Sequence, residues 1–550
     1  MLITRRGRCP QRPADRRSEI IQQENTMQLF PITLPKQNIC NETALYYRTS
    51  DPVQYDETTG IITMCKNTVL SLDTYFNCFS YSKYLQYTHA NILEVHMQVQ
   101  GDVQLRMMKA ELQNSRIYRT EKLTQTVHSE CMEEVVLQYD FGKEQGSGIL
   151  YVEVKALSNN TAVQFGYYGS PIPHEQLNHT KLAAVICTYK REAYVKRNLH
   201  HLADTILADA ELQKHIEILV IDNGKTLQKE EIEQTNLKLY PNKNCGGSGG
   251  FTRGIIEALN RKEEFSHVLL MDDDILLESN VLVKTIRFLQ IVRPEHADLA
   301  LGGSMLRLDD MTVQHEAGGR WTGRKIININ KGFNLCNTMD LLKNEIDMHP
   351  DYNAWWYCCM PLSKIDENNL PLPLFVREDD VEYGIRLFDN WLIMNGVGVW
   401  HEPFDKKDNP VMEYYNTRNQ LILNAIHYPN NPFYKNLYSL VRTTGKLLLK
   451  GNAKFVEIPF KGFDDFLLGV DFILNNDSEK IHQELVQWGN SLKHKEEKTL
   501  AAYYWYAGTR FIVTCVNGMR KYSAIVNAYQ LQKGELMMLD TWKEKLEIEV

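Results

Sequence analysis

The chain has 550 residues, of which 43% are hydrophobic and 24% are charged, and this composition is typical of a globular protein. The length predicts roughly three or four domains. A net charge of -8 gives no general reason to expect nucleic acid as a partner. Without an apolar run of 18 or more residues, a transmembrane helix is not expected. Eleven cysteines without regular spacing favour reduced thiols and a cytoplasmic setting over a disulfide framework or a zinc ribbon.

The N-terminal 26 residues are rich in arginine and lack the apolar core of a secretory signal. We expect the segment 1–27 either to be disordered or to precede a true start at Met27. Both interpretations stay open.

Residues 28–178 contain short segments in which apolar and polar residues alternate, such as 92–99 and 148–154. Glycine, asparagine and aspartate turns separate these segments. Alternation with a period of two and regular turn signals predicts an antiparallel β-sandwich or jelly roll. Aromatic residues in such a domain could stack on sugars, although most are expected in the core.

Residues 179–430 change to apolar runs, 181–188 and 215–222, with helical stretches between them. This alternation predicts a mainly parallel, Rossmann-like α/β sheet. The two runs are followed by polar residues that would share the carboxyl edge of the sheet. Arg191 is a candidate phosphate partner and Asp222 a candidate acceptor for a ribose or base group, although polar residues ordinarily follow strands.

A glycine-rich stretch, 242–254, precedes an apolar helix pattern. Gly246 and Gly247 belong to a group of four glycines in five positions, which would let the backbone approach a ligand closely. The start of the helix behind them favours an anion. The stretch matches neither a P-loop nor the dinucleotide-binding glycine fingerprint, and a flexible linker is the alternative.

The apolar run 268–271 ends in three carboxylates, Asp272, Asp273 and Asp274. Along an extended chain, Asp272 and Asp274 point to one side and Asp273 to the other. Clustered carboxylates repel one another, and a hard divalent cation that carries the phosphates of a substrate would relieve this repulsion. Asp272 and Asp274 are therefore candidate metal ligands, and an acidic helix cap is the alternative.

A second run, 374–384, also ends in carboxylates. Asp379 or Asp380 could act as a general base at the start of a helix, or could simply cap that helix. Further along, His401 follows a strand-like run and is a candidate third metal ligand, with a structural role as the alternative.

Polar and aromatic residues between these runs could line a sugar pocket. They are Glu316, Trp321, Trp355 and Trp356. Aromatic faces bind the C–H face of a sugar ring, but tryptophans are equally common in cores.

Residues 431–550 show helical periodicity and carry a basic stretch between Lys435 and Lys461. This stretch could touch anionic lipid headgroups at a membrane surface, or it could be a solvated helix face.

Together these motifs resemble the family 2 glycosyltransferases of GT-A fold, within them the branch of galactofuranosyl- and rhamnosyltransferases. The resemblance runs from about 181 to 425 and is carried by Val185–Arg191, Asn244–Gly254, Asp272–Asp274, Trp355–Trp356, Arg377–Gly384, Trp400–Phe404 and Tyr415–Asn419. The β domain before this region and the helical region after it also resemble the polymerising galactofuranosyltransferases.

The resemblance implies roles for most of the candidate residues. Thr188, Arg191, Asp222, Asn244 and Asp273, with Gly246 and Gly247, would bind the donor nucleotide; Asp272, Asp274 and His401 would hold Mn²⁺ or Mg²⁺; Asp380, with Asp379 beside it, would be the base; Trp355 and Trp356 would meet the acceptor. The polymerising enzymes have Lys-Trp-Asp-Asp where this chain has Arg377–Asp380, so acceptor preference does not carry over.

The expected function is inverting, metal-dependent transfer of galactofuranose or a related sugar such as rhamnose from a nucleotide-diphosphate donor to a growing cell-surface glycan. The alternatives are a sugar-nucleotide pyrophosphorylase and a non-catalytic glycan-binding scaffold. The expected partners are the nucleotide-sugar donor and a lipid-linked or polysaccharide acceptor, without nucleic acid. A homo-oligomer is compatible with this expectation, as is a cytoplasmic location with peripheral contact at the inner face of the membrane.

Overall fold

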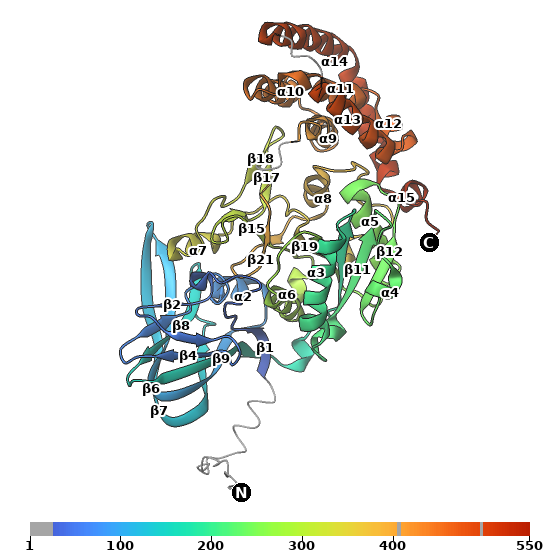
Figure 1. Cartoon of the computed structure of the whole chain (residues 1–550). Coiled ribbons are helices and arrows are strands. Elements are labelled where there is room, and N and C mark those ends of the chain that lie inside the picture. The colour runs from blue at the N-terminus through green and yellow to red at the C-terminus, as the bar shows by residue number, and fades with distance from the viewer. Residues whose placement is uncertain (1–25, 404–408, 495–498, 550) are drawn as a thin grey trace.

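The computed structural model describes residues 26–403, 409–494 and 499–549, which form an antiparallel β domain, an α/β domain and a helical region (Figure 1). Residues 1–25, to which most of the prediction for the N-terminal tail refers, lie outside the described residues. Phe404, the last residue of the Trp400–Phe404 motif, also lies outside them. Thr26 and Met27 already belong to a strand, β1 (Thr26–Pro31). This strand pairs with β9 (Thr161–Pro171), so the β domain begins slightly before the predicted boundary.

Two long strands organise the β domain, β6 (Ile92–Gln113) and β7 (Arg116–Asp140). One edge of β6 carries β9 along its first half and β8 (Gly148–Ala156) along its second half. The change occurs near Gly101, where a bulge and a φ of +94° bend the strand. The other strands are β2 (Arg48–Thr49), β3 (Gln54–Asp56), β4 (Ile61–Met64) and β5 (Val69–Ser71). All pairs are antiparallel, which confirms the predicted antiparallel class, and hydrogen bonds join the nine strands into a single sheet.

A seven-stranded sheet forms the centre of the α/β domain. Its strands, in spatial order, are β12 (Leu237–Pro241), β11 (Ile216–Asp222), β10 (Leu182–Thr188), β13 (His267–Asp272), β19 (Tyr357–Pro361), β14 (Ala300–Gly302) and β20 (Trp391–Leu392). The first four are mutually parallel, and β19 runs antiparallel to both of its neighbours. The prediction of a mainly parallel sheet is therefore confirmed.

The parallel strands end in register. Thr188 lies opposite Asp222, and Cys187 lies opposite Asp272. The apolar runs are buried because helices cover the sheet, including α3 (Glu192–Leu202), α5 (Gly246–Leu259) and α6 (Asn280–Gln290). This arrangement gathers the polar strand ends at one edge.

Smaller elements complete the α/β domain beside this edge. A three-stranded sheet contains β15 (Ser304–Arg307), β16 (Gln314–Glu316) and β21 (Gly398–His401), and a hairpin contains β17 (Gly319–Trp321) and β18 (Ile326–Asn328). The remaining helices of this domain are α4 (Lys229–Ile232), α7 (Thr338–Asn344) and α8 (Asp379–Leu387).

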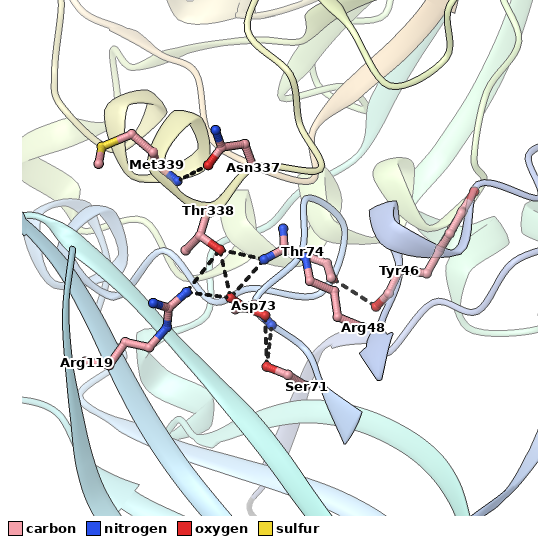
Figure 2. Close-up of polar contacts among 9 residues, drawn as sticks. All are labelled: Tyr46, Arg48, Ser71, Asp73, Thr74, Arg119, Asn337, Thr338 and Met339. Carbon is pink, nitrogen blue, oxygen red and sulfur yellow. Dashed lines mark hydrogen bonds and ion pairs between the residues drawn. The ribbon is translucent and has the colours of Figure 1, made fainter. Parts of the chain in front are cut away.

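A buried carboxylate joins the β domain to the α/β domain (Figure 2). The Oδ2 atom of Asp73 accepts hydrogen bonds from Arg48 at 2.9 Å and from Thr338 at 2.9 Å, and Arg119 lies 3.4 Å away. Thr338 is the first residue of α7, whereas the other three residues belong to the β domain. Since Asp73 is only 4% exposed, this cluster fixes α7 against the β domain.

The C-terminal region is helical, as predicted. Its helices are α9 (Met412–His427), α10 (Phe433–Leu449), α11 (Glu457–Phe466), α12 (Val470–Asn475), α13 (Ser478–Lys493), α14 (Leu500–Met537) and α15 (Leu539–Leu546). The last helix returns to the α/β domain, where Trp542 and Leu546 join the core beneath α5. Among the described helices, none is both long and apolar enough to span a bilayer.

Candidate active site

Two carboxylates and one imidazole meet at the carboxyl edge of the sheet. Asp272 ends β13, Asp274 follows in the turn, and His401 ends β21. The Nε2 atom of His401 lies 3.0 Å from Asp274 Oδ1 and 3.8 Å from Asp272 Oδ2. One ligand atom from each residue lies within 4.8 Å of the others. Oxygen donors with one imidazole nitrogen suit Mn²⁺, and also Mg²⁺, so the three residues could hold such an ion. We refer to Asp272, Asp274 and His401 as the metal group.

Asp273 is bound by residues at the end of β10 and just after it. Thr188 donates a hydrogen bond to its Oδ2 atom at 2.7 Å, and the guanidinium of Arg191 lies 3.3 Å from its Oδ1 atom. Arg191 also pairs with Asp274 at 2.5 Å. The Arg191 side chain is 43% exposed, so its positive charge stands at the open side of the metal group.

Asp222 holds the turn that follows β11. Its Oδ1 atom accepts the backbone N–H of Gly224, and its Oδ2 atom accepts those of Thr226 and Leu227. The residue is only 1% exposed. Both carboxylate oxygens are therefore engaged within the chain, and the structure gives Asp222 a turn-forming role.

The glycine-rich stretch forms the first turns of α5 and packs closely against its neighbours. A Cβ atom at Gly250 would lie 2.1 Å from the sulfur of Cys187, and one at Gly246 would lie 2.0 Å from the carbonyl oxygen of Phe375. Gly247 is open, with nothing within 4 Å. These glycines thus serve mainly close packing of the helix, and only Gly247 is free to approach a ligand.

Asn244 joins this helix start to the C-terminal region. Its Oδ1 atom accepts the backbone N–H of Gly246, and its Nδ2 atom donates to Glu479 of α13 at 3.2 Å.

The second carboxylate pair follows a strained segment. Phe375, Arg377 and Glu378 have φ angles of 73°, 72° and 56°, in the left-handed region that non-glycine residues rarely adopt. Helix α8 begins directly afterwards, at Asp379. The strain therefore lies immediately before the two candidate bases, Asp379 and Asp380.

Side chains of α9 hold this segment in place. The Nδ2 atom of Asn419 donates to the carbonyl oxygens of Val376 at 2.9 Å, Arg377 at 3.0 Å and Leu374 at 3.3 Å. Arg418 donates to Leu374 at 2.8 Å, and its Nε atom donates to Asn419 Oδ1 at 2.9 Å. Asn419 is fully buried. We refer to Arg418 and Asn419 as the α9 clamp.

The two aspartates differ in their electrostatics. Burial, and then the charge of Asp380, raises the pKa of Asp379 to about 8. Burial also raises the pKa of Asp380, but the backbone N–H of Val381 and the charge of Arg377 limit the increase, to about 6. At neutral pH Asp380 is the more ionised of the two, which suits a general base.

Burial, and then the charge of Asp380, raises the pKa of Glu316 to about 8. The three predicted sugar-contacting tryptophans lie in the interior. Trp355 and Trp356 are 5% and 4% exposed, and Trp356 donates to the carbonyl of Gly303. Trp321 is 4% exposed and donates to Asn424. In this structure the three indoles form no open platform, because they are buried in the hydrophobic cores.

The α9 clamp was not predicted as part of the site. The run Tyr415–Asn419 contributes to the family resemblance, but nothing in its spacing indicates that it contacts residues 374–377. The sequence of α9 gives no such signal, because Asn416, Gln420 and Asn424 are equally polar positions of the same helix.

Residues 183–337 match the family model described as glycosyl transferase family 2. This part of the chain, on a mainly parallel α/β sheet, is therefore similar to the family 2 glycosyltransferases.

Over most of its length the chain is related to galactofuranosyltransferase GlfT2. It is 28% identical over 444 residues to the protein from Mycobacterium tuberculosis, with 74% of this chain and 66% of the relative aligned. It is 26% identical over 427 residues to that from Mycolicibacterium smegmatis, with 73% of this chain and 64% of the relative aligned. The match thus spans slightly less than two thirds of these relatives. A solved mannosyltransferase from Pyrobaculum calidifontis, in complex with GDP-Man and Mn²⁺, covers 65% of this chain and 88% of its own, at 10% identity and a TM-score of 0.30.

Proposed function

We propose that the chain is an inverting, metal-dependent glycosyltransferase. It moves galactofuranose, or a related sugar such as rhamnose, from a nucleotide-diphosphate donor to a hydroxyl of a growing cell-surface glycan. The observation that carries this proposal is the convergence of Asp272, Asp274 and His401 at the sheet edge of a glycosyltransferase family 2 domain. The choice of sugar rests on the relatedness to the two galactofuranosyltransferases.

In the proposed reaction, Asp380 takes the proton from the acceptor hydroxyl. The hydroxyl oxygen then attacks the anomeric carbon of the donor, and the bond between that carbon and the diphosphate oxygen breaks with inversion. Mn²⁺ or Mg²⁺ held by the metal group would neutralise charge on the departing diphosphate. Arg191 adds a second positive charge at the same edge, and its present pairing with Asp273 and Asp274 can give way to phosphate.

The two alternatives fit the site less well. A sugar-nucleotide pyrophosphorylase would need a basic, phosphate-grasping signature near the first strand, and the run Thr188–Arg191 fits that signature poorly. A non-catalytic glycan-binding scaffold would have no use for two aspartates and a histidine within 4.8 Å of one another.

Release of nucleoside diphosphate tests the proposal. The protein would be incubated with Mn²⁺ and a panel of nucleotide-sugars, UDP-galactofuranose and dTDP-rhamnose among them, with and without an oligosaccharide acceptor. We expect Asp274→Ala to fold normally and to lose about 10²-fold or more of the transfer rate. A matched control is Asp298→Ala, which removes only an exposed ion pair with Lys364. Near-normal product formation by the Asp274 variant would defeat the proposed metal role.

We also propose that α10 and α14 bring the enzyme to an anionic membrane surface that carries a lipid-linked acceptor, at the inner face of the cell membrane. The two helices pack against each other. Exposed apolar side chains recur at helical spacing on one face of each. In α10 they are Tyr434, Tyr438, Val441 and Leu449, and in α14 they are Trp505, Ile512, Val516 and Met519. Nearby cations, Lys435, Arg442 and Lys450 in and after α10 and Arg520 and Lys521 in α14, suit anionic headgroups.

A further inference from the structure

A cavity of about 430 Å³ lies between the β domain and the α/β domain. One wall comes from α2 (Tyr81–Tyr87) and the loop 144–147, and the other from segments 344–350 and 391–394. Its volume falls within the range of about 300–1,000 Å³ that is common for small-molecule sites. Among the described residues that line it, none belongs to the metal group or to the carboxylate pair. The cavity is therefore separate from the candidate active site.

Several polar atoms of the cavity residues lack hydrogen-bond partners. Glu345 is only 2% exposed, and its Oε1 atom accepts from Ser80 at 2.8 Å and from Asn395 at 2.6 Å, whereas its Oε2 atom has no partner among the described residues. The hydroxyl of Ser82 and the indole N–H of Trp391 are also without partners there. Buried polar groups are normally paired. Together with the amide side chains of Gln86 and Asn330 and the hydroxyl of Ser147, which also line the cavity, these groups give it a polar character that suits a ligand with several hydroxyl groups.

The charge of the lining disfavours an anionic ligand. Three carboxylates line the cavity, Glu144, Glu345 and Asp347, and of these Glu144 is paired with Lys109 and Lys122. Among the described lining residues the single lysine is Lys83, and its ammonium already donates to the backbone carbonyls of Asn344 and Ile393. A phosphate group would therefore meet more negative than positive charge. A neutral ligand fits better.

The remaining lining is apolar and partly aromatic. It includes Tyr87, Ile346, Met348 and Leu392. Ile346 and Met348 are 45% and 38% exposed, so they stand at the mouth of the cavity. Apolar walls with a few polar groups match the alternating C–H and hydroxyl faces of a sugar.

The cavity also borders the catalytic region. Ala317 and Pro350 line it, and α8, the helix of Asp380, packs against the same region, since a Cβ atom at Gly384 would lie 2.4 Å from the Cβ atom of Tyr352. The Asp73 cluster fixes α7, which leads into Glu345, against the β domain. Both walls are thus held together beside the site of transfer.

We propose that this cavity is a second sugar-binding subsite, which holds a neutral segment of the acceptor glycan at some distance from the reacting hydroxyl. The proposal rests on the proposed glycosyl transfer for the identity of its ligand. It predicts that long acceptors bind more tightly than short ones, and that residues of the cavity cause this difference.

Isothermal titration calorimetry on the full chain, without donor, tests the subsite directly. The probes are a synthetic galactofuranosyl disaccharide, the corresponding hexasaccharide and a rhamnosyl hexasaccharide. Glu345→Gln keeps the shape of the side chain but weakens its acceptor set, and Ile346→Arg places a bulky side chain at the mouth without touching the buried network. Val136→Arg, on an exposed position of β7 in the same domain, is the matched control.

We expect Glu345→Gln and Ile346→Arg each to raise the Kd of one hexasaccharide about five- to tenfold while leaving the disaccharide unchanged. The control should bind like the wild type. Three results would overturn the subsite. The wild type could bind the disaccharide and a hexasaccharide equally well, it could bind neither hexasaccharide, or both variants could keep the wild-type affinity. Binding of a hexasaccharide without transfer from any donor would instead defeat the proposed function and leave the subsite standing.

Discussion

Asn419 offers the sharpest test of how the fold positions the base. Replacing it with alanine removes every hydrogen bond from its side-chain amide to the carbonyls of Leu374, Val376 and Arg377. Asn419 touches neither the metal group nor the carboxylate pair in the described contacts. Its effect on turnover must therefore pass through the strained segment that precedes Asp380.

The size of the effect follows from comparing the backbone strain of the segment with the hydrogen bonds that hold it in place. Three non-glycine residues at positive φ store of the order of 1–3 kcal/mol each. Each lost hydrogen bond removes about 1 kcal/mol, and a carbonyl left buried without a donor costs about 1–3 kcal/mol. The loss of three hydrogen bonds thus removes about 3 kcal/mol of support, against roughly 3–9 kcal/mol of stored strain. We expect the segment to relax, and a shift of about 1 Å at Asp380 lowers turnover about 10²-fold.

The assay separates positioning from stability. Asn419→Ala should lower kcat about 10²-fold while the donor KM stays within about threefold, since the metal group is untouched. Hydrogen exchange at the amides of 374–380 should accelerate. Asn416→Ala, on the same helix, removes a bond to Glu413 alone and serves as the control. A variant that unfolds at a lower temperature but keeps its kcat would refute the positioning role of Asn419.

Three further predictions concern the base, its neighbour and the membrane. Asp380→Asn should lower kcat about 10²- to 10⁴-fold, whereas Asp379→Asn should lower it about tenfold or less. Wild-type activity should rise with pH through about 6, as Asp380 loses its proton. Equal losses of kcat in the two variants would contradict the assignment of Asp380 as the base. The raised pKa of Glu316, about 8 against 4.5, means that its contribution to stability is complete below about pH 4.5 and is lost as pH rises through about 8. The Tm of Glu316→Gln minus that of the wild type should therefore grow between about pH 5 and 8 and then level off; a constant difference would contradict this. The double variant Trp505→Ser, Ile512→Ser should bind phosphatidylglycerol vesicles more weakly than the wild type in a sedimentation assay, and unchanged binding would count against the membrane surface.

The order of the motifs along the sequence determined much of the fold and part of the site. Apolar runs that end in polar residues predicted parallel strands whose carboxyl ends share one edge, and Thr188, Asp222 and Asp272 do end in register there. These inferences succeed because they depend on local periodicity, which the sequence carries directly.

Tertiary structure alone decided which polar and small residues remain free to contact a ligand. Asp222 is occupied by its own turn, most of the glycines before and within α5 pack against neighbours, and Trp355 is buried in the core. Contacts between distant segments also created features without any local signal: Asn419 reaches carbonyls more than 40 residues earlier, and Glu345 meets Ser80 across the domain boundary. Hydrogen bonding and close packing depend on distances in space, and periodicity along the chain does not encode those distances. The sequence therefore located the sheet edge where transfer would occur, and the three-dimensional contacts determined which side chains stand there.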